Sequence, residues 1–220
     1  MFKKFPSIEN HYQQKNIDYW LRLYPELKDE DYVITEKLDG ANFAIILTNK
    51  TINFQRRNDL LKEDESFFNY QETVKRYKND IKKIQSFLGE KETLHLYCEL
   101  IGNKVLNRVK YTNDDLNYLR IIGMSLNDKM ISPIDMISLL HLMKLEFNLD
   151  DIQNQLFTAP IFGLYKGLEK ALDFDINRNS LLLNIEDNLM EGVIIQPASK
   201  VYTDKDGSVF LIKKKNEKFF

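Results

Sequence analysis

One lysine of this chain stands where a side chain could do covalent chemistry. Lys37 follows the β-branched and aromatic run 32–35 and comes two residues before the pair Asp39-Gly40, after which an apolar run resumes. A lysine between two apolar runs is either an exposed residue at a hairpin corner or a partly buried amine available as a nucleophile. Short patterns need structural context, so this stretch alone leaves both interpretations open.

Other charged residues interrupt strand-like runs in which apolar side chains are the rule. These residues are Arg56, Glu99, Glu191, Lys213 and Lys215. Each one separately has an ordinary explanation as a charge at a strand edge. Together with Lys37 they supply a candidate nucleophile, two carboxylates and three cations. That set suits displacement at a phosphorus atom, where catalysis is mostly positioning and neutralisation of charge.

The elements that must position these residues follow from periodicity and turn signals. Strands are predicted over 32–35, 43–47, 51–57, 94–101, 119–126, 160–164, 190–196 and 209–215. Helices are predicted over 8–23, 70–88, 133–145 and 168–172. The first three strands are expected to form a meander with Lys37 at its first corner. We therefore expect an α+β protein with antiparallel sheets and helices outside, forming a single domain over residues 1–220.

Two of these elements carry specific expectations. In the strand 94–101, the face with Cys98 is expected in the core, and the face with Glu99 is expected to line a cleft. The helix 70–88 is expected to end at Gly89 and to bury its apolar positions. Its basic face favours a solvated surface over an RNA-binding stripe, because basic faces are common in lysine-rich chains; that face carries Lys75, Arg76, Lys78, Lys82 and Lys83.

Composition excludes several classes of protein. The 220 residues carry a formal net charge of −2, so nucleic-acid binding must come from a local basic patch. Cys98 is the only cysteine, which excludes an intrachain disulfide, and the three histidines are too scattered for a structural zinc site. No signal peptide or membrane-length apolar run is present, which predicts a cytoplasmic protein with no membrane partner. Abundant Asn, Lys and Ile are consistent with a phage, viral or AT-rich host origin.

The stretch Glu36-Lys37-Leu38-Asp39-Gly40 resembles the Lys-x-(Asp/His)-Gly motif of covalent nucleotidyltransferases. The details are similar to the nick-sealing RNA ligases of the RNA ligase 2 family. Further matches follow in family order and cover the whole chain: the N-terminal stretches 1–5 and 9–12, the arginine motif at Arg56, 67–70, the acidic strand motif 97–102, 191–197 and the terminal Lys-x-Lys motif 212–216. One such motif is weak, whereas the five main motifs in order, at Lys37, Arg56, 97–102, 191–197 and 212–216, are strong.

The resemblance implies the ATP-grasp-like nucleotidyltransferase fold of covalent ligases, with ATP as AMP donor and Mg²⁺ or Mn²⁺ as cofactor. Lys37 would take AMP, pass it to an RNA 5′-phosphate, and a 3′-hydroxyl would then seal the strands, so the expected partners are RNA ends in a nicked duplex. A protonated lysine cannot attack, and burial or neighbouring cations favour the neutral amine.

Roles for the remaining residues also come from the resemblance. Lys213 and Lys215 would reach the α-phosphate from one strand face. Arg56 would offer a planar fork to phosphate oxygens. The other expected nucleotide-binding residues are Glu99 at the ribose, Glu36 and Ile122 at the adenine, Asn42 near the nucleotide and 3′-end, and Glu191, which would also help to place the metal ion.

The chain departs from the family pattern in three respects. Ile122-Gly123 stands where the family has an aromatic residue followed by Asp, so a stacking contact and a carboxylate are missing. Gln196 replaces a frequent lysine. The sequence ends at Phe220, and the family's C-terminal domain is therefore expected to be absent, with a partner subunit as its possible replacement. These departures are expected to weaken the steps that involve RNA more than the transfer of AMP to Lys37.

Two alternatives stay open. A DNA ligase or capping-type enzyme would use the same lysine motif but normally adds an oligonucleotide-binding barrel. A degenerate ligase domain would serve as an RNA-binding or assembly subunit. The departures at Gly123 and Gln196 favour that second alternative, whereas an intact Lys37 favours an enzyme.

Overall fold

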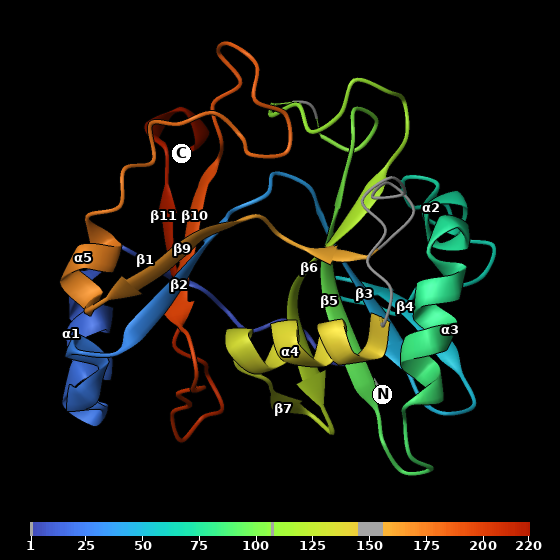
Figure 1. The fold of residues 1–220 in the computed structure, drawn as a ribbon, viewed down its shortest axis with the longest axis horizontal. Coiled ribbons are helices and arrows are strands. Elements are labelled where there is room, and N and C mark those ends of the chain that lie inside the picture. Colours follow the sequence, from blue (N-terminus) through green and yellow to red (C-terminus); the bar gives the residue numbers. More distant parts are fainter. Residues whose placement is uncertain (1, 107, 145–155) are drawn as a thin grey trace. The chain divides into compact units, whose positions relative to one another are not determined.

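The computed structural model describes residues 2–106, 108–144 and 156–220, and the chain divides into two compact units. The first unit comprises the described residues of Met1–Phe5, Gly40–Ile131 and Asp135–Thr158. The second unit comprises Pro6–Asp39, Ser132–Ile134 and Ala159–Phe220. Each unit is built on one sheet (Figure 1). That residues 1–220 act as a single domain stays a prediction.

The first unit is built on a six-stranded sheet in the order β4-β3-β5-β6-β7, with β8 beside β6. Its strands are β3 (Ala41–Leu47), β4 (Ile52–Arg56), β5 (Leu94–Ile101), β6 (Tyr118–Leu126), β7 (Lys129–Met130) and β8 (Phe157–Thr158). The helices α2 (Tyr70–Arg76), α3 (Lys78–Ser86) and α4 (Pro133–Lys144) pack against one face of it (Figure 1). The apolar residues of that face and of the helices form a continuous core, in which Cys98 is fully buried as expected.

The second unit is built on a five-stranded sheet in the order β1-β11-β10-β2-β9. Its strands are β1 (Glu9–Asn10), β2 (Asp31–Glu36), β9 (Ile161–Lys166), β10 (Gly192–Pro197) and β11 (Ile212–Lys215). The helices α1 (Gln14–Leu23) and α5 (Leu168–Leu172) cover one face, and short 3₁₀ turns occupy Pro25–Lys28 and Glu217–Phe219. Trp20 from α1 anchors this second core, because its indole contacts the rings of Tyr24 and Phe210.

The α+β prediction is confirmed, since all pairings in the two sheets are antiparallel except β1 with β11 and β6 with β8. The predicted meander at Lys37 is wrong, however. β2 belongs to the five-stranded sheet and β3 to the six-stranded sheet, so Asp39-Gly40 joins two sheets instead of turning a hairpin. Turn residues indicate where a chain changes direction and do not specify the strand with which it pairs.

Two helix predictions need correction. Residues 8–13 are not helical, because β1 pairs with β11 and the helix begins only at Gln14; its buried residues are Ile17 and Trp20, whereas Tyr12 is exposed. The predicted helix 70–88 is interrupted at Tyr77 and ends at Ser86, so Gly89 is not its C-cap. Tyr77, Ile81, Ile84 and Leu88 are buried as expected, whereas Val74 is only half-buried. Leu145, the predicted end of the third helix, lies outside the described residues.

The expected cleft on the second face of β5 is also wrong for most of that face. His95, Tyr97 and Ile101 are at most 1% exposed, and only Glu99 is half-buried. Other parts of the chain therefore cover this face, and one of them is the N-terminal segment that packs on Tyr97. Within the described residues, no helix is long and apolar enough to cross a membrane.

Candidate functional site

Lys37 lies one residue beyond β2, where backbone pairing with β10 continues. Its N–H donates to the carbonyl of Gly192 at 2.9 Å. Its Nζ lies 2.6 Å from Oε2 of Glu191, and the Nζ of Lys215 lies 3.0 Å from Oε1 of the same carboxylate. We call Lys37, Glu191 and Lys215 the lysine–carboxylate cluster. All three residues belong to the second unit, so this group is brought together within one compact body.

Burial differs sharply within the cluster. The Glu191 side chain is 4% exposed, whereas the side chains of Lys37 and Lys215 are 23% and 22% exposed. A buried carboxylate is costly unless charged partners satisfy it, and here each oxygen has its own lysine. The carboxylate therefore fixes two amines that keep access to solvent, and hence to a ligand.

Gly192 makes this arrangement possible. It has a φ of +152°, which residues with a side chain rarely adopt, and a Cβ there would lie 2.1 Å from the carbonyl oxygen of Lys214. The irregular backbone breaks the alternation of side chains along β10. Glu191 can therefore point to the face that carries the two lysines.

The alternation of β11 separates its three lysines. Lys213 and Lys215 share one face, as predicted, and Lys213 is half-buried opposite Ile194. Lys214 points the other way, and its Nζ donates to the carbonyls of Leu172 and Phe174 at 2.7 and 3.0 Å. Lys213 and Lys215 thus lie on the face of Lys37, whereas backbone carbonyls hold the Nζ of Lys214 on the other face.

Glu36 lies on the opposite face of the sheet from its neighbour Lys37. It is 1% exposed, and the N–H of Leu181 donates to its Oε2 at 2.9 Å. Burial raises the pKa of this carboxyl above its ordinary value, although hydrogen bonds from Ser180 and Leu181 oppose the shift. Within the described part of the chain, Oε1 has no hydrogen-bond partner.

The remaining predicted residues belong to the first unit. Asn42 and Glu99 face each other across β3 and β5 and are both half-buried. Residues directly opposite in an antiparallel pair point to the same face, so these two side chains are neighbours. Ile122 is half-buried at an irregularity of β6.

Arg56 lies opposite Phe43, whose side chain is part of the helix-covered core. Asn42 is the next residue along β3 and therefore points to the other face. The guanidinium of Arg56 is already paired, with Glu65 at 2.6 Å and Asp59 at 3.5 Å. Arg56 is thus not a free phosphate ligand in this structure, and a phosphate would have to compete with two carboxylates.

Two features were missed by sequence reasoning. Glu65 is the partner of Arg56, and the acidic stretch before Phe67 was the signal that could have suggested it. The ring of Phe5 lies against Gly123, a long-range contact for which the sequence holds no local signal.

Among the described residues, no group of three or more His, Cys, Asp or Glu side chains is placed to hold a metal ion. Glu191 is a single carboxylate, which fits Mg²⁺ only together with substrate oxygens and water.

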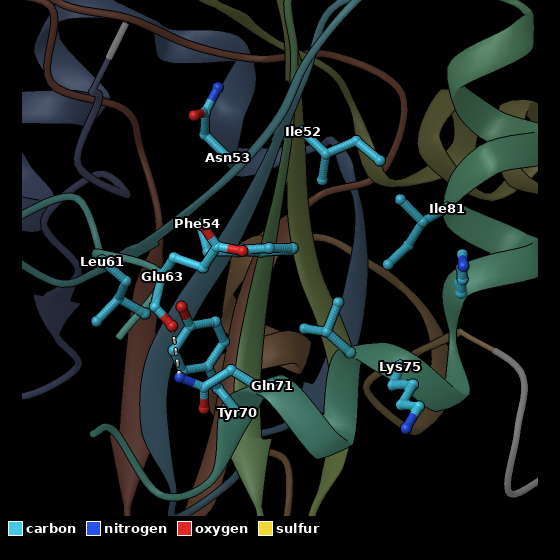
Figure 2. A pocket seen from close by; sticks show the side chains of 11 residues that line it. Ile52, Asn53, Phe54, Leu61, Glu63, Tyr70, Gln71, Lys75 and Ile81 are labelled. Atoms are coloured by element: carbon cyan, nitrogen blue, oxygen red, sulfur yellow. Dashed lines mark hydrogen bonds between the residues drawn. The ribbon is translucent and has the colours of Figure 1, made fainter. Parts of the chain in front are cut away.

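A separate hollow of about 600 Å³ opens between β4 and the helices α2 and α3 (Figure 2). Its floor includes Phe54, Tyr70 and Ile81, and its rim carries Lys75 and Lys78. None of the predicted catalytic or nucleotide-binding residues lines it. This hollow is therefore not the place where the predicted chemistry would occur.

Comparison with known proteins settles the family. The RNA ligase family model matches residues 30–215. The chain belongs to the RNA ligase family. RNA-editing ligase 2, mitochondrial, of Trypanosoma brucei brucei is 30% identical over 79 residues, which is 35% of this chain and 19% of that protein.

Solved structures of RNA ligases share the fold. A variant of Naegleria gruberi RNA ligase with ATP and Mn aligns at a TM-score of 0.68 with 16% identity, covering 100% of this chain and 57% of that one. Another variant, with AMP and Mn, aligns at 0.68 with 19% identity, covering 99% and 57%. The chain therefore spans little more than half the length of these RNA ligases.

Proposed function

We propose that this chain is an ATP-dependent RNA ligase, a covalent nucleotidyltransferase that carries AMP on Lys37. The observation that supports the proposal best is the convergence of Lys37 and Lys215 on the two oxygens of Glu191. An amine nucleophile, a second cation and a buried carboxylate in one group are what phosphoryl transfer through a lysine requires. The RNA ligases with ATP or AMP and Mn support the same nucleotide and metal.

In the first step, the Lys37 nitrogen attacks the α-phosphorus of ATP. A nitrogen–phosphorus bond forms, the bond to the β-phosphate oxygen breaks, and pyrophosphate leaves. The Nζ of Lys37 is paired with Glu191, so Glu191 must release this amine, and the amine must give up a proton, before it attacks. Lys215, with Lys213 on the same face, would then neutralise charge on the phosphate oxygens.

In the later steps, a 5′-phosphate oxygen of RNA attacks the same phosphorus and the nitrogen–phosphorus bond breaks. The 3′-hydroxyl oxygen then attacks the activated 5′-phosphate, and AMP leaves. Mg²⁺ or Mn²⁺ held by Glu191 and phosphate oxygens would supply further neutralisation of charge. We place Asn42, Glu99 and Ile122 at the nucleoside and Arg56 at a phosphate, and we expect nicked duplex ends as the substrate. The expected adenine contact of Glu36 does not fit its burial on the sheet face opposite Lys37.

A labelling experiment tests the first step. The purified chain is incubated with ATP labelled at the α-phosphate and with Mg²⁺, and covalent label is followed on a denaturing gel and by intact mass. We expect one adenylyl group per chain, lost in Lys37→Ala and retained in Lys170→Ala, which removes an exposed lysine of α5. GTP and NAD in parallel reactions distinguish a capping-type or NAD-dependent enzyme.

A folded wild-type chain that takes no label would contradict the proposal. RNA binding by such a chain would favour the non-catalytic RNA-binding subunit. Sealing of a nicked duplex by the chain alone would show that no partner subunit is needed.

A further inference from the structure

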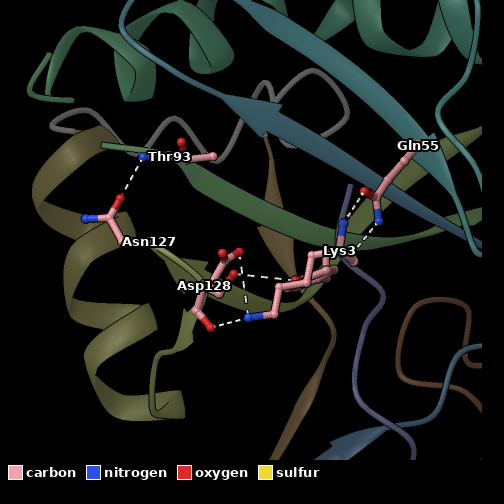
Figure 3. A network of polar contacts seen from close by, with 7 residues as sticks. Lys3, Gln55, Thr93, Asn127 and Asp128 are labelled. Atoms are coloured by element: carbon pink, nitrogen blue, oxygen red, sulfur yellow. Dashed lines mark hydrogen bonds and ion pairs between the residues drawn. The ribbon is translucent and has the colours of Figure 1, made fainter. Parts of the chain in front are cut away.

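The N-terminal segment crosses the face of the first unit's sheet that lies away from the helices. The backbone of Lys3 exchanges two hydrogen bonds with the buried side chain of Gln55, at 3.3 and 2.7 Å (Figure 3). The Nζ of Lys3 pairs with Asp128 in the turn between β6 and β7 (Figure 3). This segment is therefore fixed to β4 and to the β6–β7 turn of the same sheet.

Phe5 follows the same path across the sheet. Gln55, Ala44, Tyr97 and Gly123 are consecutive partners on β4, β3, β5 and β6, so they form one row across the sheet. Lys3 binds the first member of this row, and Phe5 packs on the last two. Its ring contacts Tyr97 edge-to-face, with centroids 5.2 Å apart.

The ring of Phe5 requires the glycine at position 123. A Cβ on Gly123 would lie 2.6 Å from Cε2 of Phe5 and 3.4 Å from its Cζ. Any side chain there would displace the ring. The sequence departure at Gly123 is thus matched by an aromatic side chain that arrives from the other end of the chain.

A β-bulge lies immediately beside this contact. Tyr97 faces Gly123 and Cys98 faces Ile121, which leaves Ile122 as the extra residue without a partner opposite. Its neighbours Ile121 and Gly123 are buried, whereas Ile122 is half-exposed. Bulges redirect side chains and often lie next to functional sites.

We propose that Phe5 is a positioning residue that acts through Ile122. Its ring packs on the backbone of Gly123 and so fixes the bulge that directs the Ile122 side chain, the residue placed at the adenine. This inference rests on the proposed function, because it assumes that Ile122 contacts the nucleotide. It makes the N-terminal segment part of ATP recognition, with no part in the bond-making steps.

Equilibrium binding tests the inference without the covalent step. ATP binding with Mg²⁺ is measured by calorimetry on the full chain carrying Lys37→Met, which cannot form the adenylate. We expect Phe5→Ala to weaken ATP binding about fivefold, because a loosened bulge no longer pre-orders Ile122. Phe5→Leu, which keeps apolar bulk, should stay within about twofold of the parent. Phe87→Ala, which removes an exposed aromatic side chain of the same unit, is the control and should not change binding.

A double-mutant cycle makes the test specific for the contact. Gly123→Ala alone should weaken ATP binding to a similar extent by displacing the ring. In the Phe5→Ala background the same substitution should add little, because the ring that it would displace is gone. In the chain with Lys37 intact, Phe5→Ala should raise KM for ATP about fivefold and change kcat by less than about twofold.

The outcomes separate this inference from the proposed function. Unchanged ATP binding in Phe5→Ala, or additive losses in the cycle, would contradict the inference alone. A parent that binds no ATP would contradict the proposed function as well. If Phe5→Ala does not fold, Gly123→Ala decides the question, with Phe5→Leu as the variant expected to keep ATP binding. Unchanged ATP binding in Gly123→Ala would then overturn the inference.

Discussion

The two units hold their predicted site residues in different ways. In the second unit, two lysines meet on one buried carboxylate, so the charges are fixed relative to one another. In the first unit, Asn42, Glu99 and Ile122 are half-buried residues on three strands, and Arg56 has its own carboxylate partners. The groups proposed for bond making are thus preorganised as a cluster, whereas the groups proposed for recognition are supplied singly by the strands of one sheet.

The largest expected effect comes from removing the shared carboxylate. Glu191→Gln keeps the size of the side chain but leaves Lys37 and Lys215 without their common anion. We expect the rate of AMP transfer to Lys37 to fall about 100-fold, as when one preorganised electrostatic group is lost from a catalytic site. Single-turnover labelling measures this rate. Thermal melting measures stability. The loss of stability should be small compared with the loss of rate, because water can solvate both lysines when their carboxylate is gone.

A matched substitution controls for loss of a carboxylate in general. Glu169→Gln alters an exposed carboxylate of α5 in the same unit and should leave the rate unchanged. Equal rates for Glu191→Gln and the wild type would show that the cluster is only structural, and the contrast between the two units would disappear.

A smaller effect is expected at Arg56 in the first unit. Arg56→Ala should slow AMP transfer about tenfold, and Arg56→Lys should restore little of it because the planar fork is lost. Glu65→Gln should strengthen ATP binding a few-fold, since it removes the closest competitor for the guanidinium. Labelling rates at subsaturating and saturating ATP measure both changes.

The neighbouring arginine sharpens this prediction. Arg57 is exposed and lies just beyond β4, so Arg57→Ala is a control of equal size and charge. A larger loss from Arg57→Ala than from Arg56→Ala would assign the phosphate contact to the later residue. Arg56 would then be a structural partner of Glu65.

Local regularity decided how much of the fold was predictable. β5 was predicted with its observed bounds, Leu94–Ile101, because its side chains alternate without interruption. The connection between two sheets at Asp39-Gly40 was not predictable, because the sheet that each strand joins depends on contacts distant in sequence. The start of α1 was missed for a similar reason, since β1 exists only through its pairing with β11.

The sequence named candidate site residues but gave little information on their arrangement. The motif around Lys37 pointed to a nucleophile, yet its partner Glu191 lies 154 residues away. The positive φ of Gly192, which turns Glu191 toward the lysines, has no signal beyond the glycine itself. The pairing of Phe5 with Gly123 shows the same limit, because steric complementarity between distant residues appears only in the fold.

The smallest expected effect is on stability and concerns Glu36, which shares the sheet of the cluster but points to its other face. Burial raises the pKa of Glu36 above its ordinary value of 4.5, so the folded state binds this proton more tightly than the unfolded state. The neutral carboxyl therefore makes its full contribution to stability below pH 4.5, the ordinary pKa of the group. This contribution is lost as the pH rises through the folded-state pKa. Glu36→Gln, which stays neutral, should escape that loss.

The free energy of unfolding from urea titrations between about pH 4 and about pH 7 tests this sign. The advantage of Glu36→Gln over the wild type should grow with pH, whereas the exposed variant Glu169→Gln should follow the wild type. Parallel curves for Glu36→Gln and the wild type would mean that the carboxyl ionises at no cost to folding. In that case the position of Glu36 would tolerate a charge. The lysine–carboxylate cluster would then be the part of the second unit on which the contrast between the two units depends.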